Sequence, residues 1–217
     1  MTKSLFRVLS LDGSGAKGFY TLGVLHEIEG LLRQSLNKGL HERFDLIFGT
    51  STGAIIAALI ALGKNTDEIH DLYKTYVPTI MRKEKPSEKS AALAELAAKV
   101  FEDMMFTDVL TNVGIVTTKW DIERPMIFKG NIAQAHGRTG TWVPGFWIKI
   151  GDAVQASCSA YPFFDKKTVT TSNGDHIELI DGGYCANNPT LYAIADALIS
   201  MQNPADNIRV VSIGVGG

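Results

Sequence analysis

The sequence predicts an α/β fold: a three-layer domain whose mostly parallel sheet carries helices on both faces. Segments typical of buried strands alternate with helical segments along the 217 residues, which is the pattern of a parallel sheet with helical cover. The composition, 45% hydrophobic and 20% charged residues, is that of a globular domain, and the length suits one sizeable core. We therefore expect residues 1–217 to form a single domain.

The first third of the chain is expected to form, in order, a strand at 6–11, a helix at 19–33, a strand at 44–48, a helix at 51–62 and a helix at 66–76. Both strands are short apolar runs, and the first helix repeats leucine and isoleucine at helical spacing. A polar connection, 34–43, precedes the second strand. Gly63 is a natural C-cap, Thr66 is expected to cap the third helix, and Pro78 is expected to limit it.

The middle of the chain, 82–105, is predicted to be a charged linker followed by an amphipathic helix. Residues 82–90 contain a proline and no apolar side chain, which is typical of a linker. The helix at 91–105 would either act as a lid over a site or simply cover the sheet. The later elements are expected to be strands at 115–118, 126–128, 177–180 and 209–213, and a helix at 189–198 capped by Asn188.

The segment that follows the last predicted strand is unusual. It is followed by a glycine-rich stretch with Gly214, Gly216 and Gly217, whereas a parallel strand is normally followed by a crossover helix. Either this strand lies at an edge of the sheet or the chain is truncated at its C-terminus. We favour truncation.

Composition and charge exclude several classes of protein. The net charge of -2 gives no electrostatic basis for binding a nucleic-acid polymer. Cys158 and Cys185 lack metal-ligand spacing, so no metal is expected, and a reduced, cytoplasmic setting is the simplest interpretation. We expect no other cofactor either. The N-terminus has no signal-peptide pattern, and the longest apolar segment, 54–62, is too short to cross a bilayer. Any membrane contact is therefore expected to be peripheral.

The pentapeptide Gly-Thr-Ser-Thr-Gly at 49–53 lies between a predicted strand and a predicted helix. A G-x-S-x-G pattern in that setting predicts a nucleophile elbow, a tight turn that lifts the Ser51 hydroxyl clear of the backbone. Gly49 and Gly53 remove side chains that would block the bend. Ser51 is therefore the candidate nucleophile, and an ordinary turn serine is the alternative.

A second glycine-rich loop, Asp-Gly-Ser-Gly-Ala-Lys-Gly at 12–18, joins the first strand to the first helix. It matches G-x-G-x-x-G, but a dinucleotide site also needs an acidic residue at the end of the second strand, where the Ser51 elbow stands instead. The loop can present backbone N–H groups at a helix N-terminus to a negative oxygen. We expect an oxyanion site here, with a ligand-free turn as the alternative.

A third motif, Asp181-Gly182-Gly183, follows the strand at 177–180. Because the carboxyl ends of parallel strands lie at one edge of a sheet, Asp12, Ser51 and Asp181 are expected to converge there. That convergence is why this motif is more than an ordinary turn.

The activating base is expected to be a carboxylate. No histidine stands in a motif, although His136 and His176 lie in predicted loops and keep a Ser–His–Asp esterase open as an alternative. The remaining candidate is Asp181, which makes a Ser–Asp dyad with Ser51. Such a base needs an environment that raises its pKa by desolvation.

The three motifs, in this order, resemble those of the patatin-like phospholipase family. The resemblance runs from Leu9 to about Asn188 and includes the stretch 156–164 that precedes the aspartate motif. It implies that Ser51 is the nucleophile and Asp181 the base. It also implies a backbone oxyanion hole at Gly13, Ser14, Gly15 and Ala16, with supporting glycines at Gly18, Gly49, Gly53, Gly182 and Gly183.

The resemblance implies a catalytic domain of a lipid acyl hydrolase of the phospholipase A type, acting through an acyl-enzyme on a phospholipid or other lipid ester. Bacterial relatives include phospholipases switched on by cyclic nucleotides in antiphage defence, so an activating small ligand is an open expectation. Aromatic residues at 142–147 suit a membrane interface, although packing on the core is the commoner role.

Two positions depart from the family pattern. Ser14 replaces a glycine, which would be strained at positive φ, and Lys17 replaces the usual arginine. These departures keep a second class open, a catalytically silent module that binds an anion or a lipid headgroup.

Overall fold

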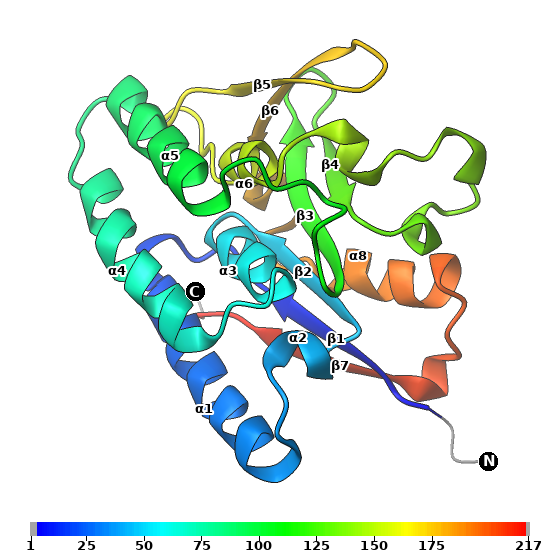
Figure 1. The fold of residues 1–217 in the computed structure, drawn as a ribbon. Helices are drawn as coiled ribbons and strands as arrows, with labels where there is room; N and C mark the ends of the chain where they lie inside the picture. Colours follow the sequence, from blue (N-terminus) through cyan, green and yellow to red (C-terminus); the bar gives the residue numbers. More distant parts are fainter. Residues whose placement is uncertain (1–3, 216–217) are drawn as a thin grey trace.

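The structure, a computed structural model, describes residues 4–215 as three layers with a seven-stranded sheet in the middle (Figure 1). Gly216 and Gly217, at the predicted glycine-rich end, lie outside the described residues. The strands are β1 (Phe6–Leu11), β2 (Leu46–Thr50), β3 (Asn112–Lys119), β4 (Arg124–Lys129), β5 (Lys167–Thr170), β6 (His176–Asp181) and β7 (Ile208–Ile213). The α/β class is confirmed.

The sheet has a parallel half and an antiparallel half. β7, β1, β2 and β3 are neighbours in that order and run parallel. β4 pairs with β3, β6 pairs with β3, and β5 pairs with β6, all antiparallel. The sheet is therefore mixed, and its parallel strands are those on which the first two glycine-rich motifs stand.

The direction of β6 corrects one expectation from the sequence. Asp181 does not end a parallel strand, because β6 runs antiparallel to β3. Thr50 of β2 pairs with Val116 of β3, and Asp181 pairs with the next residue, Thr117. Since β4 occupies the other edge of β3, β2 and β6 share one edge and meet end to end. Their carboxyl ends converge as expected, but for this different reason.

One face of the sheet carries the larger helical layer, on the left of Figure 1. Alternate residues of β1, Leu9 and Leu11, point into this core, and residues 53–61 are all buried. The helices of this layer are α1 (Gly18–Leu36), α3 (Thr52–Ala61), α4 (Thr66–Met81), α5 (Pro86–Phe101) and α6 (Ile150–Ser157).

The other face carries a smaller layer. α8 (Thr190–Ala195), which continues into a π-helical turn at Asp196–Ser200, covers Val8, Leu46 and Phe48. The short helices α2 (Leu40–Arg43) and α7 (Gly183–Ala186) lie in connections. Helices on both faces are thus confirmed.

α4 differs from its prediction at both ends. Its N-cap is Asn65, not Thr66: the Asn65 side chain accepts the Glu68 N–H, and the Glu68 carboxylate accepts the Asn65 N–H. The helix also continues past Pro78 to Met81. A proline inside a helix costs about 3 kcal/mol. Burial of the neighbouring Val77 and Ile80 side chains in the core offsets this cost.

The predicted linker is mostly helix, so that prediction is wrong. Only 82–85 is non-helical, because Pro86 occupies the first turn of α5, where its missing N–H is not needed. α5 ends at Phe101, four residues earlier than expected. Movement of this segment as a lid stays a prediction.

β7 lies at one end of the strand order, as the edge alternative proposed, while truncation of the chain stays a prediction. Within residues 4–215, no helix combines the length and the apolar character that crossing a membrane requires.

Candidate active site

Ser51 stands in a sharp turn between β2 and α3, as the elbow pattern predicts. Its φ is +54° and its ψ is -125°, a conformation that strains any residue with a side chain. Its N–H donates to Ser157 Oγ at 2.9 Å, and that hydroxyl in turn donates to the Val116 carbonyl at 2.6 Å. Ser157, at the end of α6, thereby ties the elbow to β3.

The elbow closes because two glycines let backbones approach. A Cβ at Gly49 would collide with the Gly53 carbonyl, and a Cβ at Gly53 would collide with the carbonyls of Leu11 and Asp12. The supporting role predicted for Gly49 and Gly53 therefore has a steric basis: α3 packs directly on the ends of β1 and β2.

Asp181 lies within hydrogen-bond distance of the serine. The Ser51 hydroxyl donates to Asp181 Oδ2 at 2.6 Å, and the Gly183 N–H donates to Oδ1 at 2.6 Å. The carboxylate is buried, and burial raises its pKa, although these two hydrogen bonds act in the opposite direction. A carboxylate with a raised pKa accepts a proton more readily than an exposed one.

The residues beside Asp181 explain its placement. Gly182 has no room for a side chain, because a Cβ there would collide with the Val116 carbonyl of β3. The Asp181 N–H donates to the Ser159 carbonyl at 2.9 Å. The stretch 156–164, which resembles the family motif, therefore holds Asp181 in position.

The predicted oxyanion loop has only part of its backbone available. The Gly13 N–H donates to the Asn187 carbonyl at 3.0 Å, and the Ser14 N–H donates to Thr52 Oγ1 at 3.0 Å. Among residues 4–215, no acceptor is bonded to the N–H of Gly15 or Ala16. Two of the four predicted donors are thus already used, and the other two remain for a ligand.

Ser14 brings no strain to this loop. Its φ is -134°, and the positive φ of +53° falls on Gly15 instead. The Ser14 hydroxyl lies 3.1 Å from Thr52 Oγ1, so the departure from glycine adds a contact with α3. Lys17 is exposed on the short helical turn that follows.

Tyr73 and Asn187 support the loop, and neither was found from the sequence. The Tyr73 hydroxyl, on α4, donates to the Gly15 carbonyl at 2.9 Å. Gly18 is required beside it, because a Cβ there would collide with that hydroxyl. The Asn187 carbonyl accepts the Gly13 N–H and so contacts the loop at its start. No motif marks either residue, since each acts through tertiary contact.

Asp12 does not join the other two polar residues, contrary to the expected convergence. Its carboxylate lies against Gly214, just beyond β7. Burial raises its pKa. The three motifs meet through the backbone of the loop and the side chains of Ser51 and Asp181.

No candidate histidine reaches the serine. His136 Nε2 lies 2.6 Å from Asp196 Oδ1, in a cluster with Lys129. His176 begins β6, about 16 Å from Asp181 at a rise of about 3.3 Å per residue. Of the described residues that line the cavity at Ser51, none is a histidine.

A cavity of about 310 Å³ opens at Ser51 and Asp181. Its walls are largely apolar, from α3, α4, α5 and the segment after α6. Cys158 also lines it, and burial raises the pKa of that thiol well above its usual value. The apolar lining comprises Ile55, Val77, Ile80, Met81, Leu93, Ala160, Phe163 and Phe164.

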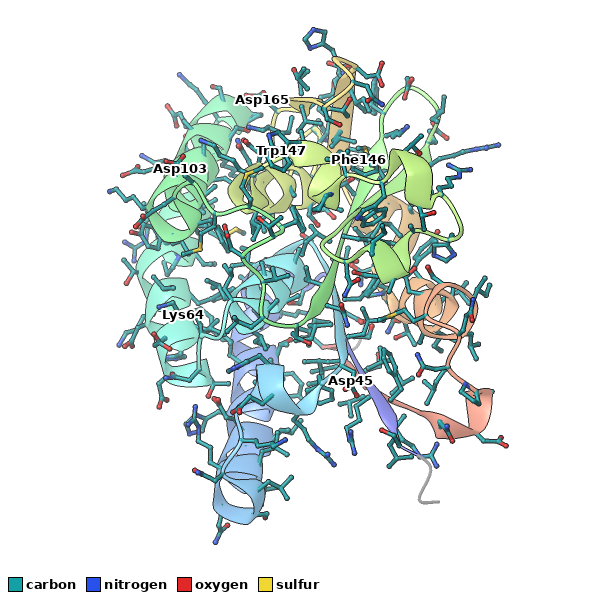
Figure 2. The ribbon with its side chains drawn as sticks, turned by 45° about the vertical axis from the view of Figure 1, so that its right-hand side comes forward. Asp45, Lys64, Asp103, Phe146, Trp147 and Asp165 are labelled. Carbon is teal, nitrogen blue, oxygen red and sulfur yellow. The ribbon has the colours of Figure 1, made fainter. Side chains whose placement is uncertain are left out.

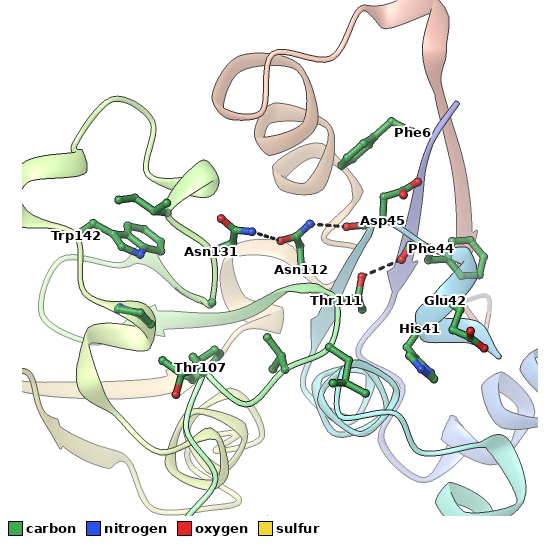
Figure 3. A pocket seen from close by; sticks show the side chains of 16 residues that line it. Phe6, His41, Glu42, Phe44, Asp45, Thr107, Thr111, Asn112, Asn131 and Trp142 are labelled. Atoms are coloured by element: carbon green, nitrogen blue, oxygen red, sulfur yellow. Dashed lines mark hydrogen bonds between the residues drawn. The ribbon is translucent and has the colours of Figure 1, made fainter. Parts of the chain in front are cut away.

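A second, larger cavity of about 720 Å³ lies away from Ser51 (Figure 3). Asn131 donates to Asn112, whose side chain donates to the Asp45 carbonyl. Glu42 and Asp45 line this cavity, and the described lining contains no lysine or arginine.

The aromatic run at 142–147 is not part of the Ser51 cavity. Trp142 lines the larger cavity, and the Phe146 ring packs edge-on against Phe128 at 5.8 Å. Figure 2 shows Phe146 and Trp147 together on this segment. Phe146 is 39% exposed despite this contact, and Trp147 is 61% exposed.

Several known proteins resemble this chain in sequence or in fold. The profile described as patatin-like phospholipase matches residues 9–194. An Escherichia coli protein named cUMP-AMP-activated phospholipase is 60% identical over 213 residues, covering 98% of this chain and 65% of that protein. A Vibrio cholerae protein named cGAMP-activated phospholipase is 28% identical over 241 residues, covering 99% of this chain and 65% of that protein.

This chain thus spans 65% of the length of both relatives. A crystal structure of VipD from Legionella pneumophila superposes with a TM-score of 0.55 at 12% identity, over 96% of this chain and 50% of that one. That likeness is one of fold.

Proposed function

The chain belongs to the patatin-like phospholipase family, whose profile matches most of its length, and on that premise we propose that it hydrolyses the carboxylic esters of lipids. The observation that carries the proposal is the 2.6 Å hydrogen bond from the Ser51 hydroxyl to a buried Asp181 carboxylate. A serine hydroxyl becomes a strong nucleophile only when a neighbouring base takes its proton. This pair has the contact that such a transfer requires.

The proposed reaction follows from these positions. Ser51 Oγ attacks the ester carbonyl carbon while its proton passes to Asp181 Oδ2. The proton then moves to the leaving alcohol, which departs and leaves an acyl-enzyme. Water, deprotonated by Asp181, attacks the acyl carbonyl and releases the fatty acid.

The oxyanion of each tetrahedral intermediate needs donors fixed in advance. We assign this role to the N–H groups of Gly15 and Ala16, which have no bonded acceptor within residues 4–215. Gly15 also lines the cavity. The Gly13 and Ser14 N–H groups hold the loop in place instead.

The substrate is proposed to be a phospholipid. An apolar cavity at the nucleophile suits an acyl chain. Exposed apolar side chains at its rim, Met81 and Phe163, suit peripheral contact with a membrane. By its 60% identity to a relative named as cUMP-AMP-activated, the whole protein is further proposed to respond to a cyclic dinucleotide.

The test is hydrolysis of a short-chain p-nitrophenyl ester and of a phospholipid, each with and without cUMP-AMP. Asp181→Asn is expected to lower kcat by about 10²–10⁴-fold, the contribution of a general base. Ser51→Ala is expected to abolish turnover. Ser172→Ala and Asp175→Asn, at exposed positions, are the matched controls and should retain it.

Turnover that survives in both Ser51→Ala and Asp181→Asn would contradict the dyad. Absence of turnover with every ester, with or without the nucleotide, would favour the silent binding module. The unstrained φ of Ser14 removes one of the two sequence features that favoured such a module.

A further inference from the structure

Lys89 is a charged residue of the Ser51 cavity to which neither the motifs nor the proposed mechanism gives a role. It lies in the first turns of α5. Among the described residues that line the cavity, Asp181 and Lys89 are those with charged side chains. Asp181 is in contact with the serine, whereas Lys89 stands on a wall that is otherwise apolar.

The Lys89 ammonium has no carboxylate partner within 4.0 Å among residues 4–215. Other lysines are paired, for example Lys99 with Glu95 and Lys149 with Asp103. Instead, Lys89 Nζ lies 6.0 Å from the centroid of the Phe164 ring. Contact with a ring face stabilises a cation without neutralising it.

The same wall is fixed to α5 and lies near the N-terminal end of that helix. The Asp165 N–H donates to Ser90 Oγ at 2.8 Å, which ties the segment that carries Phe164 to α5 (Asp165 is labelled at the top of Figure 2). α5 is 16 residues long, and its N-terminal end carries the positive end of the helix dipole. A lysine in this position is unfavourable for the helix by itself, but lysine and dipole together attract an anion.

We propose that Lys89 determines specificity by binding the phosphate of a glycerophospholipid whose acyl ester lies at Ser51. This inference rests on the proposed function and deepens it. In such a lipid the phosphate and the ester carbonyl are joined by the short glycerol backbone, so both fall within one cavity and its rim. The acyl chain occupies the apolar walls, and the phosphate meets the unpaired ammonium.

The kinetic test compares kcat/KM for a short-chain glycerophospholipid with kcat/KM for an uncharged acylglycerol of the same chain length. Lys89→Met is expected to lower the ratio of these constants by about ten- to hundredfold, the scale of a hydrogen bond between charged groups. Lys89→Arg should preserve most of the ratio. Lys85→Met, at an exposed position outside the cavity lining, is the control and should leave it unchanged.

A binding test does not depend on turnover. A short-chain di-ether glycerophospholipid has the phosphate but no ester, and its affinity is measured beside that of the uncharged di-ether glycerol. Lys89→Met should weaken only the first, by about tenfold or more. Higher ionic strength should weaken the same interaction in the unmodified protein.

An equal loss for both lipids would assign Lys89 a structural role and overturn the proposal, as would an unchanged ratio. Weaker binding of an ionised fatty acid alone would assign the lysine to the product instead and also overturn it. A different outcome is that no ester is hydrolysed but Lys89→Met still weakens binding of the lipid that contains phosphate. In that case the proposed hydrolysis is wrong, while the assignment of Lys89 to phosphate binding stands.

Discussion

Ser51 has a backbone conformation that is unfavourable by itself, and Asp181 has a carboxylate whose burial is unfavourable by itself. A non-glycine residue at the φ of +54° seen for Ser51 costs about 1–3 kcal/mol. Asp181 loses solvation on burial, which raises its pKa. Neighbouring groups hold both residues in these states. The Ser157 hydroxyl accepts the Ser51 N–H, and the Gly183 N–H donates to the Asp181 carboxylate. Such concentrated strain is typical of a catalytic site.

The raised pKa of Asp181 predicts the pH dependence of the reaction. Only the ionised carboxylate accepts the Ser51 proton, so kcat/KM should fall as pH decreases through the raised pKa. The fall is expected at a higher pH than an ordinary aspartate would give. The measurement is a pH profile of kcat/KM on a soluble ester, and an acid limb within the ordinary aspartate range would contradict it.

At the scale of elements, the site is assembled by α4 and by the segment after α6. α4 supplies Tyr73, which holds the Gly15 carbonyl, and also part of the cavity wall. The segment after α6 fixes Asp181 through Ser159 and supplies Phe163 at the rim. Each element serves both the reacting groups and the lipid cavity.

Tyr73→Phe is expected to lower kcat by about three- to tenfold, because one hydrogen bond that orients the oxyanion loop is lost. Tyr76→Phe, on the same helix, is the matched control. The measurements are kcat on a soluble ester and the thermal unfolding midpoint. A loss of stability without loss of kcat would show that Tyr73 serves packing rather than the loop.

Phe163→Asp is expected to weaken binding to phospholipid vesicles by about tenfold or more, because Phe163 is 66% exposed at the rim and would bury its ring in lipid. Leu191→Asp, at a 74% exposed position on α8, is the control and should bind as before. Vesicle co-sedimentation gives the result. Equal binding by both variants would place the lipid surface elsewhere.

At the scale of the whole molecule, a buried ion pair joins the sheet to the smaller helical layer. Lys129 of β4 donates to Asp196 Oδ1 at 2.5 Å, and Gln134 donates to Oδ2 at 3.0 Å. Asp196 begins the π-helical turn, and both charged groups are nearly inaccessible to solvent. This cluster lies outside the Ser51 cavity, so it acts on stability.

Asp196→Asn is expected to lower the free energy of unfolding by about 3–5 kcal/mol, because it leaves the Lys129 ammonium buried without a counter-charge. Urea denaturation measures the change. Glu95→Gln removes one partner of an exposed pair with Lys99 and should leave the midpoint unaltered. An equally small effect at Asp196 would mean that water or His136, whose Nε2 lies 3.3 Å from the Lys129 ammonium, already solvates the lysine.

Much of the fold and of the candidate site could be predicted because the signals are local. The alternation of apolar runs and helical repeats predicts β1, α1, β2 and α3. Most of their predicted ends lie within two residues of the observed ends. The elbow at Ser51 depends on glycines two positions away. The linker at 82–90 was wrong because a proline preceded by charges also suits a helix start, and Pro86 takes that role.

The sequence by itself determined the α/β class, the order of the motifs and the two side chains that meet at the site, because backbone conformation near a glycine or a strand end depends on adjacent residues. Tertiary structure alone decided that β6 runs antiparallel and meets β2 end to end. It also decided that Tyr73 and Asn187 hold the loop, and that Lys89 faces the cavity. The physical reason is that these contacts join residues far apart in the chain, and only packing of the helices on the sheet selects which of them meet.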